Sequence, residues 1–427
     1  MTTKNGDKQE PQFAAFLAID WADQKHVWSL QSADSDLREQ GEVEQTPEAI
    51  EAWVAQMRQR FGNRPIAVAV EQTRGALVFL LSKYEQLHIF PVPPAMTANL
   101  RKAFYSSGAK DDPKDSDLLL DIVVLHREKL RRLSPDTEAT RLIQNLVEER
   151  RKLVDEKTAQ SNRLMAHLKI YFPQIPRLFE DVGSPLVCDL LERWPTLEEL
   201  QKVRPAALRN FFRQHRCRQE LIESRVQAIG SALPALGDQA VVKAKMQVVK
   251  VTVQLIRILH QGIKALERQI QEAAEGHPDF FIFDSLPGAG AVMAPRLLAA
   301  FGSQRERYES AEELQTWSGI APVRASSGKQ EWVHFRYACP KFLRQTFHEW
   351  ADYSIRQSEW ARAYYELQCR RGKKHHAAVR ALAFKWIRIL YRCWKDRVAY
   401  DESIYVAALE KRKSPLASAA MAAEVGL

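Results

Sequence analysis

The chain has 427 residues, of which 45% are hydrophobic and 27% charged, with a net charge of +9 and a pI near 9.2. This length allows two or three domains, and the basic balance favours a polyanionic partner. No apolar run is long enough to cross a membrane, the polar amino terminus has no signal-peptide core, and the five cysteines lack CxxC spacing. We therefore expect a cytoplasmic protein with reduced cysteines and neither a zinc site nor a disulfide framework.

Strand and helix signals alternate in the first part of the chain. Strands are predicted at 13–19, 26–31, 41–45, 65–70 and 89–92. Thr46 and Pro47 predict the start of a helix after the third strand, as N-cap and first helical residue, and a second helix is expected near 77–86. This order predicts an α/β, RNase H-like (RuvC-like) domain at 13–130, preceded by a disordered segment at 1–12.

Four acidic residues stand at the ends of these elements. Asp20 ends the apolar run 16–19, and Glu71 follows the run 66–70. Asp112 and Asp115 lie three residues apart at the start of an apolar helix, which puts both carboxylates on one helix face. An acid at the tip of a buried strand is costly unless it faces a pocket or binds a metal, and converging oxygen ligands suit Mg²⁺ and phosphoryl transfer. Taken singly, each acid could instead cap a helix or a turn.

From about residue 137 the pattern changes to apolar residues at helical spacing among many charges. One long amphipathic helix is expected through Leu142, Leu146, Leu153, Leu164 and Leu168, and a second over 248–270. Two such helices could pair within one chain or between subunits as a coiled-coil arm, which we place at 131–277. The segment 172–238 also reads as helical and carries no chemical motif. We expect it to be an insertion resting on the arm, with its charges in solvent.

The region 278–410 is expected to be mainly helical. Its sequence Leu-Pro-Gly-Ala-Gly at 286–290, followed by the apolar stretch 292–301, resembles a helix-hairpin-helix. Gly288 and Gly290 would let the backbone approach a phosphate, and the next helix would offer free N–H groups and the positive end of its dipole. A plain turn explains the same residues. The Ala- and Ser-rich end, 411–427, is expected to be a flexible tail.

A second chemical signal follows the Gly-Ile-Ala-Pro run at 319–322. Two serines precede a glycine in the polar stretch 323–329, which is expected to be a loop, with Arg324, Lys329 and Arg336 close in sequence. This composition is typical of an exposed hydroxyl among phosphate-binding groups. Serine is a weak nucleophile unless it is activated, and no His is adjacent, so a Ser/His/Asp triad is not indicated. A metal-bound phosphate would be a sufficient electrophile, and an ordinary loop serine is the alternative.

The ordered set of motifs, from about residue 16 to 405, resembles the DEDD transposases of the IS110 insertion-sequence family, relatives of the Piv DNA invertases. That family has an Asp after a short apolar strand, a Glu followed by a small residue and a Gly, and a Lys-x-Asp-x-x-Asp helix start. Asp20, Glu71 and the run from Lys110 to Asp115 match these motifs. Three features depart from the pattern: Asp111 replaces the more usual Thr or Asn, 338–342 lacks a Lys-x-Gly run, and 172–238 is longer than in compact members.

The resemblance implies that Asp20, Glu71, Asp112 and Asp115 bind Mg²⁺. It also implies that the Ser directly before Gly after the G-[IL]-x-P motif is the nucleophile, which is Ser327, with the adjacent Ser326 as the rival. The implied activity is site-specific DNA recombination that excises and inserts the element through a covalent phosphoserine link, on the bacterial nucleoid.

The resemblance further implies a structured noncoding guide RNA from the element itself, which pairs with target and donor DNA. It implies a homo-oligomer, a dimer or tetramer, in which a serine and an acid cluster from different subunits act together and the arm mediates assembly. The nucleic-acid contacts are expected to include Arg344 and the basic run Arg370, Arg371, Lys373 and Lys374. A solvated helix end explains that run equally well.

Two other functions stay open on the sequence. A RuvC-like structure-specific nuclease would keep the metal site and use metal-activated water in place of the serine, but the additional carboxy-terminal region argues against it. A non-catalytic nucleic-acid-binding scaffold would tolerate degraded acids, and the four intact acids argue against that function.

Overall fold

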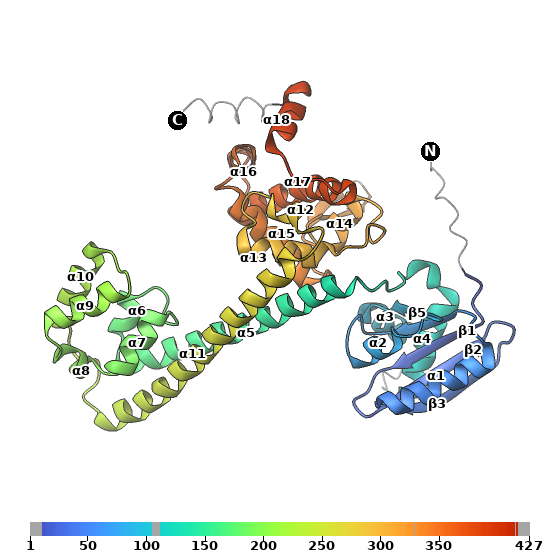
Figure 1. Cartoon of the computed structure of the whole chain (residues 1–427), viewed down its shortest axis with the longest axis horizontal. Coiled ribbons are helices and arrows are strands. Elements are labelled where there is room, and N and C mark those ends of the chain that lie inside the picture. The colour runs from blue at the N-terminus through green and yellow to red at the C-terminus, as the bar shows by residue number, and fades with distance from the viewer. Residues whose placement is uncertain (1–10, 105–111, 329, 415, 417–427) are drawn as a thin grey trace. The chain divides into compact units, whose positions relative to one another are not determined.

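The computed structural model describes residues 11–104, 112–328, 330–414 and 416, and of residues 112 and 113 only the backbone. The chain divides into two compact units between Pro135 and Asp136 (Figure 1). The first unit is α/β, and the second is almost entirely helical. Among the described residues, every helix is too short or too polar to span a lipid bilayer.

The first unit contains a five-stranded sheet in the order β3-β2-β1-β4-β5. Its strands are β1 (Ala15–Asp20), β2 (Lys25–Ser32), β3 (Arg38–Glu44), β4 (Ile66–Val70) and β5 (Leu87–Pro91). The first three strands are antiparallel, whereas β4 and β5 run parallel to β1. All five predicted strands are present, with ends within a few residues of the prediction, and the arrangement is consistent with an RNase H-like fold.

Four helices accompany this sheet: α1 (Pro47–Phe61), α2 (Ala76–Leu81), α3 (Pro94–Phe104) and α4 (Asp112–Leu125). Thr46 is the N-cap of α1 as predicted, because its hydroxyl accepts the Ala49 N–H at 3.2 Å. The helix α2 is shorter than the predicted 77–86 and ends at Leu81. The helix α3 was not predicted, and a 3₁₀ turn (Arg127–Lys129) follows α4.

The alternation of large and small residues along β1 and β4 decides which helix covers which face of the sheet. Leu17, Ile19 and Val68 pack with the buried side of α1 on one face. Ala18 and Ala69 point to the other face and pack with the apolar side of α4. Small side chains under α4 let this helix lie close to the strands, which positions the start of α4 near their ends.

The second unit is built on two long antiparallel helices, α5 (Glu138–Tyr171) and α11 (Gln239–Glu275), called here the arm (Figure 1). The end of α5 and the start of α11 share one hydrophobic core, and the start of α5 and the end of α11 share another. The two predicted helices are therefore present and pair within one chain. A coiled-coil packing of their side chains stays a prediction.

Five short helices pack on the first of these cores, between Leu164 and Leu168 of α5 and Val253 of α11. They are α6 (Gln174–Leu178), α7 (Pro185–Arg193), α8 (Leu197–Gln201), α9 (Pro205–Gln214) and α10 (Gln219–Gly230). The segment 172–238 is thus helical as predicted, and it rests on one end of the arm.

The carboxy-terminal helices pack on the other core. They are α12 (Phe280–Asp284), α13 (Gly290–Phe301), α14 (Ala311–Trp317), α15 (Lys341–Ser354), α16 (Glu359–Arg370), α17 (His375–Asp396) and α18 (Glu402–Lys411). Trp350, Trp360 and Trp386 are fully buried, Trp386 contacts both of the others with tilted rings, and each indole N–H donates a hydrogen bond.

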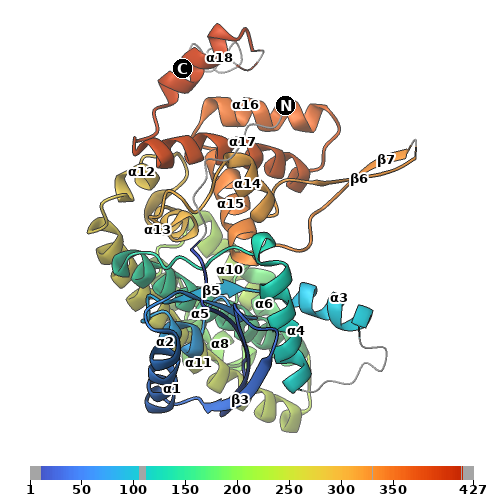
Figure 2. The same cartoon turned by 90° about the vertical axis from the view of Figure 1, so that its right-hand side faces the viewer.

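The stretch expected to be a polar loop is instead a β-hairpin of β6 (Val323–Ser327) and β7 (Gln330–His334). Figure 2 shows it extending away from the helices around it. Gly328 has a φ of +60°, the left-handed conformation that a tight hairpin turn requires. Lys329, one of the predicted contacts, lies outside the described residues.

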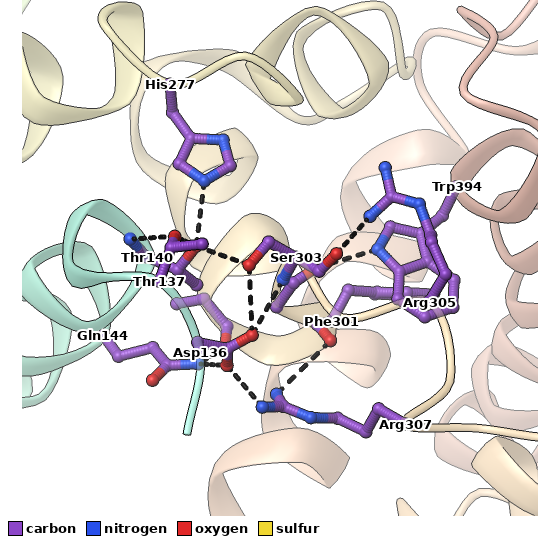
Figure 3. A network of polar contacts seen from close by, with 12 residues as sticks. Asp136, Thr137, Thr140, Gln144, His277, Phe301, Ser303, Arg305, Arg307 and Trp394 are labelled. Atoms are coloured by element: carbon purple, nitrogen blue, oxygen red, sulfur yellow. Dashed lines mark hydrogen bonds and ion pairs between the residues drawn. The ribbon is translucent and has the colours of Figure 1, made fainter. Parts of the chain in front are cut away.

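A buried polar network ties the start of the arm to the carboxy-terminal helices (Figure 3). At its centre, the Asp136 carboxylate accepts hydrogen bonds from Arg307, from the Ser303 N–H at 3.0 Å and from the Gln144 side chain at 2.9 Å. Gly302 lies against this carboxylate, with a φ of +73° and no room for a Cβ atom. The network therefore sets where α5 begins relative to the end of α13.

We expect Asp136→Ala to destabilise the second unit by about 3–5 kcal/mol, because Arg307 would lose its partner in a buried site. The matched control is Asp155→Ala, which removes an exposed carboxylate paired with Arg151 on α5 and should change stability by less than about 0.5 kcal/mol. Urea unfolding followed by tryptophan fluorescence measures both. Equal effects of the two substitutions would contradict a structural role for the network.

Candidate functional site

Asp20 and Glu71 leave the sheet side by side. The strands β1 and β4 are parallel neighbours, and Ile19 pairs with Val70 at their carboxyl ends. Asp20 is the last residue of β1, Glu71 directly follows β4, and both are half-buried. The parallel register therefore brings two of the predicted acids to one edge of the sheet.

The helix α4 brings its first turn to the same edge. The Ser116 hydroxyl lies 2.8 Å from that of Ser29, which pairs with Ala18 near the end of β1. Asp121, later in α4, pairs with Arg38, whose strand partner Gln31 lies opposite the start of β1. The helix therefore runs antiparallel to β1, and its acidic start lies toward Asp20.

Asp115 lies in this first turn and is buried, with 6% of its surface exposed. Asp112 is the first residue of α4, about one turn before Asp115. Its side chain lies outside the described residues, so its contact with the other acids stays a prediction.

The helix α3, which sequence reasoning missed, contacts two of the acids. The Thr97 hydroxyl donates to Glu71 Oε1 at 2.6 Å, and Arg101 donates to Asp115 Oδ1 at 2.7 and 2.9 Å. Thr97 and Arg101 are four residues apart and lie on one face of α3, so they bring the two carboxylates toward each other. The available signal was the Pro-Pro pair after β5, since proline is favoured at the first position of a helix.

Carboxylate oxygens are the type of ligand that a hard divalent cation such as Mg²⁺ prefers. Here they come from three elements that meet at one edge of the sheet. Within the described residues, no three acidic, His or Cys side chains come close enough together to hold an ion. The Arg101 guanidinium instead supplies the positive charge at Asp115. Binding of a metal through Asp115 would require this carboxylate to exchange Arg101 for the ion.

A buried histidine fixes the loop that follows Asp20. His26 is fully buried at the start of β2, its Nδ1 accepts the Ala22 N–H at 3.1 Å, and its Nε2 lies against the Gln45 side chain. Burial lowers the pKa of His26, while the Gln45 hydrogen bond opposes this effect. The neutral form, with the proton on Nε2, therefore holds the loop in place.

The hairpin register separates the two candidate serines. Cross-strand partners share one face of a two-stranded sheet, and faces alternate along each strand. Ser327 pairs with Gln330 and shares its face with Trp332, whereas Ser326 pairs with Glu331 on the opposite face. Both serines are exposed. By the same alternation Arg324 lies on the face of Ser326 and Glu331, so that face carries a guanidinium and a carboxylate, and the register leaves both serines as candidates.

Two of the predicted nucleic-acid-binding arginines support the base of this hairpin. Arg336 donates to the Ala321 carbonyl at 3.4 Å, and Arg344 donates to the Arg336 carbonyl at 3.3 Å. The guanidinium of Arg344 also lies over the Phe335 ring, 4.9 Å from its centroid. Arg324, on the hairpin itself, is exposed.

The remaining predicted contacts lie in two turns. Gly288 has a φ of +76°, a Cβ there would lie 2.7 Å from the Ser354 nitrogen, and its N–H donates to Gln357. This glycine is thus required by packing against α15, and its N–H is engaged within the chain. Gly290, with a φ of +51°, begins α13. The basic run is exposed at the junction of α16 and α17, and consists of Arg370, Arg371, Lys373 and Lys374.

Two family models match the chain. Residues 17–173 match an IS110-type DEDD model described as a transposase, and residues 282–366 match a model described as a transposase of the IS116/IS110/IS902 family. The first match contains the sheet except for the first two residues of β1, the four acids and α5, and the second contains the hairpin with both serines. The helices α6–α11 lie between the two matched ranges.

The chain is also similar to curated proteins of bacterial insertion elements. It is 25% identical over 401 residues to the mini-circle putative transposase for IS117 of Streptomyces coelicolor, covering 92% of this chain and 97% of that protein. It is 26% identical over 348 residues to an uncharacterized 43.6 kDa protein of insertion element IS110 from the same organism, covering 80% and 84%. A putative transposase, y4uE, of Sinorhizobium fredii is 25% identical over 228 residues, covering 51% and 61%.

We expect His26 to make the first unit sensitive to acid. The pKa of His26 is lower in the folded chain than its ordinary value of 6.5, so the unfolded chain binds a proton first as the pH falls. Stability is therefore lost as the pH drops below about 6.5. His26→Gln should lose less thermal stability than the wild type between about pH 7.5 and about pH 5.5. An identical loss in both proteins would show that His26 is not held neutral.

Proposed function

Because this chain belongs to the IS110 family of DEDD transposases, we propose that it cleaves and rejoins DNA through its carboxylate cluster and the serine of its exposed hairpin. The observation that supports this proposal most is the meeting of Asp20, Glu71 and the first turn of α4 at one edge of the sheet. Transposases act on DNA, and the net charge of +9 suits that partner.

In this proposal Asp20, Glu71, Asp112 and Asp115 would hold Mg²⁺. The bound ion would neutralise charge on the phosphodiester and its leaving oxygen. The chain's own residues prepare the cluster: the Thr97 hydroxyl orients Glu71, and Arg101 balances the charge of Asp115. His26 keeps the loop after Asp20 in one conformation, which fixes the direction of that carboxylate.

Ser327 is the proposed nucleophile. Its Oγ forms a bond to phosphorus while the bond from phosphorus to the leaving sugar oxygen breaks. The serine proton is released, and the leaving oxygen takes up a proton. The phosphoserine link keeps the energy of the broken bond for the later joining step. The family motif, in which the serine directly precedes a glycine, supports Ser327 over Ser326, and the hairpin exposes both hydroxyls.

We further propose a homo-oligomer, a dimer or tetramer, in which the serine of one subunit acts with the acids of another. A structured noncoding RNA of the element would choose the DNA sequences by base pairing, while the protein grips backbones. The exposed basic run from Arg370 to Lys374 is suited to such sequence-independent contacts.

A nuclease that uses metal-activated water would need the acids and not the serine. Substitution of the serine therefore separates these two activities, and nucleic-acid binding without any cleavage by the wild type would indicate a scaffold.

We expect Ser327→Ala to abolish the covalent protein–DNA adduct, because the hydroxyl that attacks phosphorus is gone. Ser326→Ala is the matched control and should retain the adduct. Asp20→Asn should abolish all strand cleavage, since a neutral amide is a poorer ligand for a hard cation than a carboxylate. Denaturing gels of end-labelled element DNA measure adduct and cleavage together.

Full adduct formation by Ser327→Ala would reject Ser327 as the nucleophile. Strand cleavage without an adduct in the wild type would favour the nuclease instead. Persistent cleavage by Asp20→Asn would reject the role of the carboxylate cluster.

We expect Arg101→Gln to tighten Mn²⁺ binding by about threefold or more, because a positive charge that competes with the ion for Asp115 is removed. Lys102→Gln, one residue further along α3 and exposed, is the matched control and should leave the affinity unchanged. Asp115→Asn should weaken binding. Isothermal titration calorimetry measures all four proteins, and weaker binding by Arg101→Gln would contradict the competition.

A further inference from the structure

The second unit contains a cavity of about 720 Å³ where the arm meets the carboxy-terminal helices. Its walls come from α5, α11, the first turns of α13 and the start of α15. This volume lies within the range of about 300–1,000 Å³ that is typical of small-ligand sites. The cavity is therefore far larger than a lone phosphate ion needs.

The lining combines two kinds of side chain. Val147, Ile270, Val292 and Phe342 give it an apolar part, and Val292 is 45% exposed. The charged part contains five cations and one carboxylate, which are Arg150, Arg151, Lys264, Arg268, Arg296 and Glu267. An aromatic and aliphatic surface beside an excess of positive charge suits a ligand that has both a flat ring and an anionic group.

Acidic neighbours balance only part of this charge. Glu267 binds Arg150 at 2.6 Å, and Glu349 pairs with both Arg296 and Arg151. Lys264 and Arg268 lie four residues apart on α11 and are exposed, and no described residue forms an ion pair with either of them. These two cations are therefore available to an anion in the cavity.

The charges also repel one another. Burial lowers the pKa of Arg296, and the charges of Arg151 and Arg150 act in the same direction, although Glu349 opposes them. A bound anion would relieve this repulsion. The first turn of α13, which follows the Gly288–Gly290 turn, adds the positive end of its dipole at Ala291 and Val292.

We propose that this cavity binds one unpaired nucleotide of a nucleic-acid strand, with its phosphate at Lys264 and Arg268 and its base against Phe342 and Val292. The inference rests on the proposed nucleic-acid partner and adds a site to it. A duplex presents phosphates on its outside while its bases stay paired, so it would use the cations without filling the apolar part. A single strand can supply both groups, and stacking of one base on an aromatic side chain contributes about 1–3 kcal/mol.

The test is the affinity of the full-length protein for a fluorescein-labelled single-stranded oligonucleotide, measured by anisotropy. The variant Lys264→Gln/Arg268→Gln should bind this strand at least about tenfold more weakly. The matched control is Lys243→Gln/Lys250→Gln, which removes two exposed lysines from α11 outside the cavity and should change binding by less than about twofold.

A second substitution tests the base. Phe342→Leu keeps an apolar side chain, and should weaken single-strand binding by about fivefold or more while leaving the affinity for a matched duplex unchanged. Equal losses for both duplex and single strand would overturn a site for an unpaired base. Equal losses of single-strand affinity in Lys264→Gln/Arg268→Gln and in Lys243→Gln/Lys250→Gln would show only a general effect of charge. That result would overturn the site.

Competition by a free nucleoside monophosphate distinguishes a site for a nucleotide within a strand from a site for a free nucleotide. We expect it to compete much more weakly than the strand, and equal affinity would overturn the assignment to a strand. The binding assay involves no cleavage, so it separates this inference from the proposed function. Normal binding by the cavity variants, with adducts still lost in Ser327→Ala, would reject the cavity alone.

Discussion

The parallel pairing of β1 with β4 is the constraint on which the candidate site depends. Because Ile19 lies opposite Val70, the residues that follow these strands leave the sheet together. The small side chains beneath α4 then allow that helix to lie close enough for its first turn to reach the same edge. A shift of one residue in this register would turn Asp20 or Glu71 to the opposite face and separate the carboxylates.

Much of the first unit could be predicted from sequence, because buried strands and capped helices have local signals. Apolar runs located β1 and β4, all five strands were predicted, and Thr46 with Pro47 located the start of α1. The contacts of α3 could not be predicted in the same way. Thr97 and Arg101 are ordinary helix-surface residues in sequence, and only the fold brings them to Glu71 and Asp115.

The hairpin of β6 and β7 was also not predicted from the sequence. Its serines were expected in a loop, since Ala, Ser and Gly carry little strand signal and the stretch has no apolar alternation. Strand pairing is a non-local property, and here it assigns Ser326 and Ser327 to different faces. Likewise, Gly288 was expected to approach a phosphate, but the positive φ and the close Ser354 backbone give it a packing role.

The arm has a mechanical consequence. Its helix α5 has 34 residues and is therefore about 50 Å long at about 1.5 Å per residue. Each end is embedded in a separate hydrophobic core, and the Asp136 network clamps one of them. A stiff rod held in this way works as a lever: a tilt of a few degrees at the clamped end displaces the α6–α10 group by a distance comparable to one base step, about 3.4 Å.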